Sequence, residues 1–167
     1  MTSAYACSVS SPTRISLFTG MNAARHRVTN WTLHRNQEVD SPHPLLCYPH
    51  WNVNGMTPVD SIERACYALP LPQVLHDNGY HTIHCGKAHL GAIGTPAANP
   101  LNLGFDVNIA GHACGGPASY LGEDNFGNWL VDGKPNIWGI PGLEEYHGKD
   151  IFLSEALTLE AMAALDR

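Results

Sequence analysis

The sequence predicts an α/β fold with a mostly parallel sheet, and three stretches carry that prediction. Residues 2–9 read as a short strand or extended approach that leads directly into a short helix ending at Gly20. Residues 80–85 read as a second strand, which ends at Gly86, and residues 150–167 carry the clearest helical pattern. A strand that runs into a turn and a helix is the unit of open α/β sheets, which place their chemistry at the carboxyl ends of the strands.

The first helix is predicted from the residues at its two ends. Ser10 is a good N-cap, because its hydroxyl oxygen accepts hydrogen bonds from the free amides of the first turn, and Pro12 has no amide to leave unpaired. Gly20 suits the left-handed residue that follows a last helical turn. The start of such a helix favours anions, and Arg14, one turn beyond Ser10, adds a fork of donors for an oxyanion.

Lys87 and His89 follow the strand predicted at residues 80–85. Because they are two positions apart, extended chain would project them to the same side, where both reach one anion. An ammonium group supplies a compact positive charge, and an imidazole can move a proton near neutral pH. His81 and His84 are an odd number of positions apart, which puts them on opposite faces of a strand and argues against a metal pair.

The remaining elements follow from turn residues and from periodicity. A short helix is expected at residues 73–77, and a strand at residues 107–110. Apolar residues three and four positions apart predict the helix within residues 150–167. Two loops, at residues 37–58 and at the glycine-rich stretch 112–120, are expected to shape access to a site.

Composition and charge exclude several classes of function. The chain has 167 residues, of which 44% are hydrophobic, and this suits one domain with its own core. Its formal charge is −6 and its basic residues are scattered, which argues against a nucleic-acid surface. No apolar run approaches the roughly 18 residues of a membrane span, and the first residues do not read as a signal peptide. The cysteines are odd in number and irregularly spaced, which predicts free, mostly buried thiols.

Two short motifs resemble the signatures of one enzyme family. Residues 8–20 read SVSSPTRISLFTG, and residues 79–91 read GYHTIHCGKAHLG. The first is similar to the type I sulfatase signature, in which Cys or Ser is followed by Pro, then Arg, and finally a closing Thr-Gly. The second is similar to the family's second signature, and the GFD of residues 104–106 resembles the turn that comes after it. Two motifs in the family's order are difficult to attribute to chance.

The resemblance implies a fold, an activity and a set of site residues. The fold is that of the alkaline-phosphatase-like superfamily, a three-layer α/β/α sandwich with a mostly parallel central sheet, and the activity is hydrolysis of sulfate esters. In the family the residue that matches Ser10 is oxidised after translation to formylglycine, whose hydrate attacks sulfur and ligates the metal ion. The residue matching Arg14 steadies the hydrate, the one matching Lys87 binds the sulfate, and the one matching His89 hydrogen-bonds the hydrate.

The same resemblance implies a calcium ion and a partial domain. Sulfatases hold a divalent cation, usually Ca²⁺, through an early Asp-Asp pair and a later Asp-Asn or Asp-Gln pair. No Asp precedes Asp40 in this sequence, and neither pair is found. Residues 1–167 are therefore interpreted as a partial sulfatase catalytic domain that lacks the first metal-binding strand and the C-terminal part. We expect little or no sulfatase activity from this chain alone, and an exposed sheet edge that favours association.

The implied partners are a sulfated small molecule or glycan and a maturation enzyme that makes the formylglycine. Serine-type members are generally matured in bacteria by an iron-sulfur radical enzyme, and the family is often periplasmic or secreted. The sequence leaves the substrate open. Trp129 and Trp138 are candidates for stacking on a sugar ring. The basic residues 25–27 either add to the positive electrostatic field around the sulfate or are solvated charges on a loop. A phosphatase or phosphonate hydrolase of the same superfamily, and a non-catalytic remnant or binding module, are the alternative functions.

Overall fold

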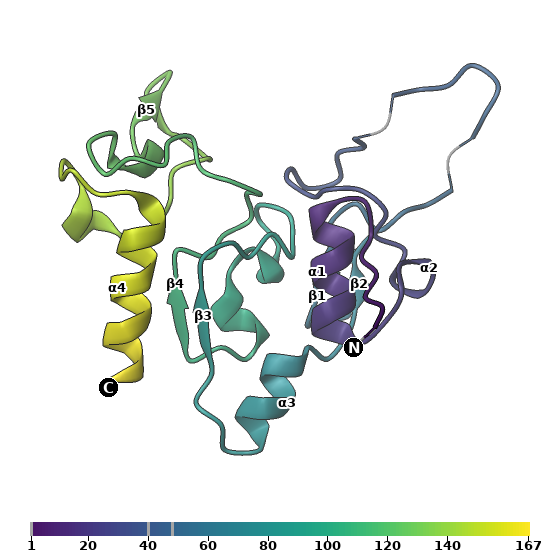
Figure 1. Cartoon of the computed structure of the whole chain (residues 1–167). Coiled ribbons are helices and arrows are strands. Elements are labelled where there is room, and N and C mark those ends of the chain that lie inside the picture. The colour runs from purple at the N-terminus through teal and green to yellow at the C-terminus, as the bar shows by residue number, and fades with distance from the viewer. Residues whose placement is uncertain (1, 40, 48) are drawn as a thin grey trace.

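The structure is a computed structural model that describes residues 2–39, 41–47 and 49–167. Four α-helices form within this part of the chain, and Figure 1 shows how they are arranged. They are α1 (Ser10–Thr19), α2 (Ala23–His26), α3 (Leu71–Asp77) and α4 (Leu153–Leu165), with 3₁₀ turns at Pro96–Ala98, Pro100–Leu103, Asn125–Gly127 and Glu144–Tyr146. None of these helices has the length and apolar character that crossing a bilayer requires.

The strands of the described residues are short and pair two by two. β1 (Met56–Thr57) runs parallel to β2 (Cys66–Tyr67), β3 (Ile83–Cys85) runs parallel to β4 (Val107–Ile109), and β5 (Leu130–Val131) forms an antiparallel hairpin with β6 (Lys134–Pro135). The chain is therefore a mixed α/β structure with two parallel pairs. A three-layer sandwich on one central sheet stays a prediction, which this arrangement does not confirm.

Two apolar clusters hold these elements together, and α4 and α1 lie on opposite sides of the molecule (Figure 1). On one side α4 packs beside β3 and β4, and its Ala156 is fully buried in a cluster with Phe126 and Leu143. On the other side Ile15 of α1 packs with Met56 of β1 and with Leu90, which follows β3. The segment after β3 thus lies between the two clusters, and it is this segment that carries Lys87 and His89.

Several expected elements are confirmed, with boundaries that differ by a few residues. The first helix ends at Gly20, whose φ of 68° is the left-handed conformation expected of the residue after a last turn. The strand expected at residues 80–85 forms only at Ile83–Cys85, and the helix expected within residues 150–167 forms at Leu153–Leu165. All five cysteines are free thiols, as expected, but the expectation that most are buried is wrong, because only Cys66 and Cys114 are buried.

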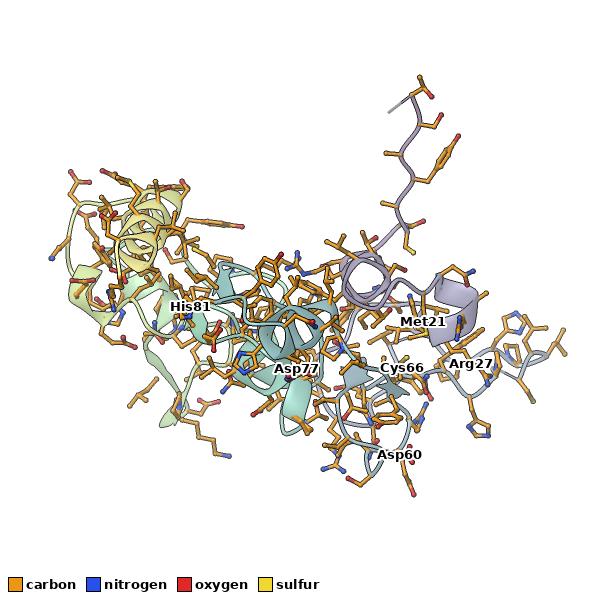
Figure 2. All side chains as sticks on the ribbon, turned by 90° about the horizontal axis from the view of Figure 1, so that it is seen from below. Met21, Arg27, Asp60, Cys66, Asp77 and His81 are labelled. Atoms are coloured by element: carbon orange, nitrogen blue, oxygen red, sulfur yellow. The ribbon has the colours of Figure 1, made fainter. Side chains whose placement is uncertain are left out.

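The segment before α1 differs from the expectation. Residues 2–7 form no strand, and Tyr5 within them is 95% exposed. Figure 2 shows this segment leading away from the body of the molecule at the start of α1. The reason is that no strand of the described residues lies alongside it, so its backbone has no ladder partner.

Candidate functional site

Ser10 is the first residue of α1, but its side chain does not cap the helix. Val9 occupies the N-cap position, and no side chain there bonds the first turn. The Oγ of Ser10 instead lies 3.0 Å from Nδ1 of His89, 79 residues further along the chain. The two sequence motifs therefore meet in space through Ser10 and His89. The expectation that Ser10 serves as an N-cap is wrong.

His89 is held in one orientation by three hydrogen bonds. Its φ of 52° is left-handed, and its backbone N–H donates to the carbonyl oxygen of His112 at 3.0 Å. Its ring Nε2 lies 2.9 Å from the carbonyl oxygen of Thr32. Because a carbonyl oxygen only accepts, Nε2 must carry the proton, and a neutral ring then has its lone pair on Nδ1. Ser10 therefore donates its hydroxyl proton to His89.

Burial keeps this imidazole neutral. Removal from water is the main cause that lowers the pKa of His89 to about 4; the hydrogen bond to the Thr32 carbonyl opposes it, and the positive charges of Lys87 and Arg14 add to it. His89 is only 4% exposed. At neutral pH the ring is thus an acceptor toward residue 10, which is the state that a general base requires.

A buried pair of hydroxyl side chains fixes the Thr32 carbonyl relative to α1. Ser11, in the first turn of α1, accepts a hydrogen bond at 3.1 Å from the backbone N–H of Thr32. Both side chains are almost completely buried. The start of α1, the Thr32 backbone and the His89 ring consequently form one connected unit.

Arg14 fastens the loop after β3 to α1. Its Nε donates to the carbonyl oxygen of Ala88 at 2.6 Å, and its Nη2 donates to the carbonyl oxygen of Lys87. Burial lowers the pKa of Arg14 from its ordinary value, although not enough to change its charge at neutral pH. The expected fork of donors is therefore used in part on the backbone, and the positive charge stays at the site.

Lys87 and His89 diverge, although extended chain would have kept them on one side. His89 turns inward to Ser10, whereas Lys87 is exposed and lines a cavity of about 180 Å³. Burial of its stem, followed by the charge of Arg14, lowers the pKa of Lys87. Within the described residues neither Lys87 nor Arg14 forms an ion pair with a carboxylate. Two unpaired cations therefore stand beside a neutral imidazole, an arrangement that suits an anion.

This geometry agrees with the comparison with known protein families. The sulfatase family model matches residues 1–159. The chain belongs to the sulfatase family. No curated protein sequence matches the chain significantly. Sulfatases are hydrolases of sulfate esters, so the family accounts for an anion site at the start of α1.

Sulfatases generally depend on a divalent metal ion, and the described residues of this sulfatase chain do not fit one. No group of three or more His, Cys, Asp or Glu side chains within residues 2–39, 41–47 and 49–167 is placed to hold a metal ion. Calcium prefers six to eight oxygen ligands, and Ser10 by itself supplies one. The assignment of Ser10 as a calcium ligand therefore stays a prediction without support from its neighbours.

The motifs did not single out Thr32 and His112, whose carbonyl oxygens hold the ring and the backbone of His89. Thr32 acts through its carbonyl oxygen, which no side-chain pattern reveals. His112 lies within the glycine-rich loop that was expected to shape access, and its carbonyl oxygen holds the His89 backbone. The only sequence signal for His112 was its position in that glycine-rich loop.

The basic turn after α1 serves the fold of the sulfatase chain. His26 is fully buried, with Nε2 lying 3.0 Å from Ser16 Oγ and Nδ1 accepting from the Val28 N–H at 3.1 Å. Arg27 is exposed and lies over the Trp51 ring, with Cζ 5.9 Å from the ring centroid, on the outer side of the molecule (Figure 2). These contacts favour a structural role for the turn over a role in the field around sulfate.

A second hollow, of about 220 Å³, adjoins His89. Trp31 and Trp138 both line it, and Trp129 does not. An aromatic platform at this sulfatase site would therefore pair Trp138 with Trp31, and the predicted pairing of Trp129 with Trp138 receives no support from this hollow.

Proposed function

We propose that this chain binds the sulfate group of a sulfate monoester at Ser10, Arg14, Lys87 and His89 and that its reaction is hydrolysis of the ester. The observation that carries the proposal is the 3.0 Å contact between Ser10 Oγ and His89 Nδ1, because it brings together one candidate catalytic residue from each of the two motifs. Arg14 and Lys87 supply positive charge without a carboxylate partner in the described part of the chain, and this favours an anion over a neutral ligand.

We propose further that Ser10 is the residue oxidised to formylglycine by a maturation enzyme. The surroundings of Ser10 fit this modification, since an oxygen on its Cβ already lies at hydrogen-bond distance from His89. The hydrated aldehyde supplies a hydroxyl nucleophile together with a second hydroxyl that can later release the sulfate.

The remaining chemistry is assigned to the side chains of the chain itself. His89 Nδ1 accepts the proton of the hydroxyl at residue 10 as that oxygen becomes a nucleophile, because its lone pair faces that oxygen. Lys87 neutralises charge on the sulfate oxygens, and Arg14 keeps the loop and its positive charge in place. No step is assigned to a metal ion, because the described residues offer no group that would hold one.

Titration with inorganic sulfate tests the anion site without requiring turnover. In isothermal calorimetry Lys87→Ala should weaken sulfate binding about 10- to 100-fold, since a charge-assisted hydrogen bond contributes about 1.5–3 kcal/mol. Lys134→Ala is the matched control, because Lys134 is an exposed lysine on the β5–β6 hairpin. Equal losses in the two variants, or no sulfate binding by the unmutated chain, would overturn the proposal.

Two further measurements test the chemistry. Mass spectrometry of the peptide that contains residue 10, from chain made in its native host, should show the loss of two hydrogen atoms that converts serine to formylglycine. Because the described residues hold no metal site, we expect slow turnover by the chain alone, with sulfate monoesters preferred over phosphate monoesters and Ser10→Ala inactive. Faster hydrolysis of phosphate monoesters would favour the phosphatase alternative, and an unmodified, inactive residue 10 would favour a binding module.

A further inference from the structure

The cavity beside Lys87 is lined by both polar and apolar side chains. Its volume is about 180 Å³, and it lies between the end of β3 and the helix α4. Lys87, His112 and Tyr120 contribute polar side chains to its lining, and Ile140, Leu153 and Leu157 contribute apolar ones. Because Lys87 is also a proposed sulfate-binding residue, the cavity shares Lys87 with the proposed sulfate site, while Ser10, Arg14 and His89 are not part of its lining.

The size and lining of the cavity select the kind of group that it can hold. A cavity of about 150 Å³ lined by leucine, isoleucine and phenylalanine binds benzene. A space of about 180 Å³ to which Ile140, Leu153 and Leu157 contribute apolar side chains is therefore large enough for one small ring or a short branched alkyl group. A sugar would leave its hydroxyl groups without partners along Ile140, Leu153 and Leu157, which offer no hydrogen-bonding side chain.

His112 is the unpaired polar group of this cavity. Both of its ring nitrogens are buried, and neither has a hydrogen-bond partner within the described part of the chain. Burial lowers the pKa of His112, and the nearby Ala110 backbone offsets only part of that effect, so the ring is neutral at neutral pH. A buried polar group without a partner destabilises the protein, and a ligand that pairs with the ring removes that cost.

His112 is also placed firmly beside the site. Its backbone carbonyl oxygen accepts the hydrogen bond from the His89 N–H at 3.0 Å. A group that extends from a sulfate at Lys87 into the cavity therefore enters a space that His112 also lines.

We propose that this cavity receives the alcohol part of the sulfate ester, that this alcohol is small and apolar, and that His112 hydrogen-bonds the ester end as it enters. The inference rests on the proposed function, because it takes the sulfate to lie at Lys87. His112 is then a residue that determines specificity, and the apolar ends of Leu153 and Leu157 distinguish a hydrocarbon from a sugar.

Calorimetric titration of the purified chain with three probes tests the inference. The probes are phenyl sulfate, inorganic sulfate and glucose 6-sulfate, which share the anion and differ in what it carries. Phenyl sulfate should bind about 10- to 100-fold more tightly than either of the others, the gain expected from burying one phenyl group. Leu157→Phe should fill the cavity and abolish this preference while sulfate affinity stays unchanged.

Leu159→Phe is the matched control, because Leu159 lies on the same helix, is 44% exposed and is not part of the cavity lining. His112→Phe provides a second test that keeps a ring in place, and it should weaken phenyl sulfate binding about tenfold, the loss of one hydrogen bond. Circular dichroism and thermal melting establish that each variant is folded before its affinity is compared with that of the unmutated chain.

The outcomes separate the inference from the function on which it rests. If inorganic sulfate binds and Lys87→Ala removes that binding, but phenyl sulfate binds no more tightly, the proposed function stands and the apolar pocket is refuted. If phenyl sulfate is preferred but Leu157→Phe leaves the preference intact, the apolar group lies elsewhere and the inference is again refuted. If no sulfate compound binds in a way that depends on Lys87, the proposed function itself fails.

Discussion

Gly115 is the position at which a single methyl group should disturb the site most directly. A Cβ on Gly115 would lie 2.7 Å from Cε1 and 2.9 Å from Nδ1 of the His89 ring, well inside van der Waals contact. The ring has little freedom to retreat, because Nε2 is bonded to the Thr32 carbonyl oxygen and Nδ1 to Ser10. Gly115→Ala must therefore displace the ring or the loop and break at least one of these hydrogen bonds.

The size of the effect follows from what is broken. A buried donor or acceptor that loses its partner costs about 1–3 kcal/mol, so Gly115→Ala should lower the free energy of unfolding by about that amount. Each kcal/mol corresponds to a fall in Tm of roughly 2–4 °C for a domain of this size. Urea unfolding followed by circular dichroism measures the free energy, and thermal melting measures Tm.

Gly116 provides the control for this prediction. A Cβ on Gly116 meets no atom within 4 Å, so Gly116→Ala removes the same backbone freedom without touching the ring. Its effect should be neutral or slightly stabilising, by up to about 1 kcal/mol, because alanine restricts the unfolded chain. Equal stability of the two variants would show that Gly115 does not constrain His89 and would refute the reasoning.

Two predictions concern the response to pH. The pKa of His89 is about 4 in the folded chain and about 6.5 in an unfolded one, so unfolded chains bind more protons and the free energy of unfolding should fall as pH drops from about 6.5 to about 4. His89→Gln should flatten this part of the profile measured by urea unfolding, and an unchanged slope would contradict the assignment. The Asp106 carboxylate accepts one hydrogen bond from the Thr82 N–H at 2.8 Å and one from the Thr82 hydroxyl at 3.0 Å. These bonds, of which the backbone one has the larger effect, lower the pKa of Asp106 from 3.8 to about 2. Asp106→Asn should abolish the loss of stability between pH 3.8 and pH 2, and retention of that loss would place its origin elsewhere.

The helix that carries Ser10 was predictable because its boundaries depend on local chemistry. Pro12 near the start and Gly20 after the end specify where the helix forms, and both act within a few residues of their own positions. The direction of the Ser10 side chain was not predictable in this way. Local reasoning made Ser10 a cap, whereas its hydroxyl bonds His89, a partner that only the tertiary fold brings within reach.

The surroundings of Lys87 and His112 were likewise not predictable from local sequence patterns. The side chains of Lys87 and His89 were expected to be parallel on extended chain, but the φ of 52° at His89 breaks the alternation on which that expectation depends. His112 belongs to a loop whose sequence indicates only flexibility and small residues. The burial of its ring nitrogens without a hydrogen-bond partner in the described part of the chain, beside a cavity that α4 also lines, depends on the tertiary fold, which no local pattern encodes.

The different orientations of His89 and Lys87 result from one backbone carbonyl group and one backbone turn. The Thr32 carbonyl oxygen can only accept, so it keeps the proton on Nε2 of His89 and leaves the lone pair of Nδ1 facing residue 10. The left-handed turn at His89 sends its ring inward and leaves Lys87 facing the cavity. In the proposed reaction this one short loop supplies both a neutral base for the hydroxyl of residue 10 and a positive charge for the anion.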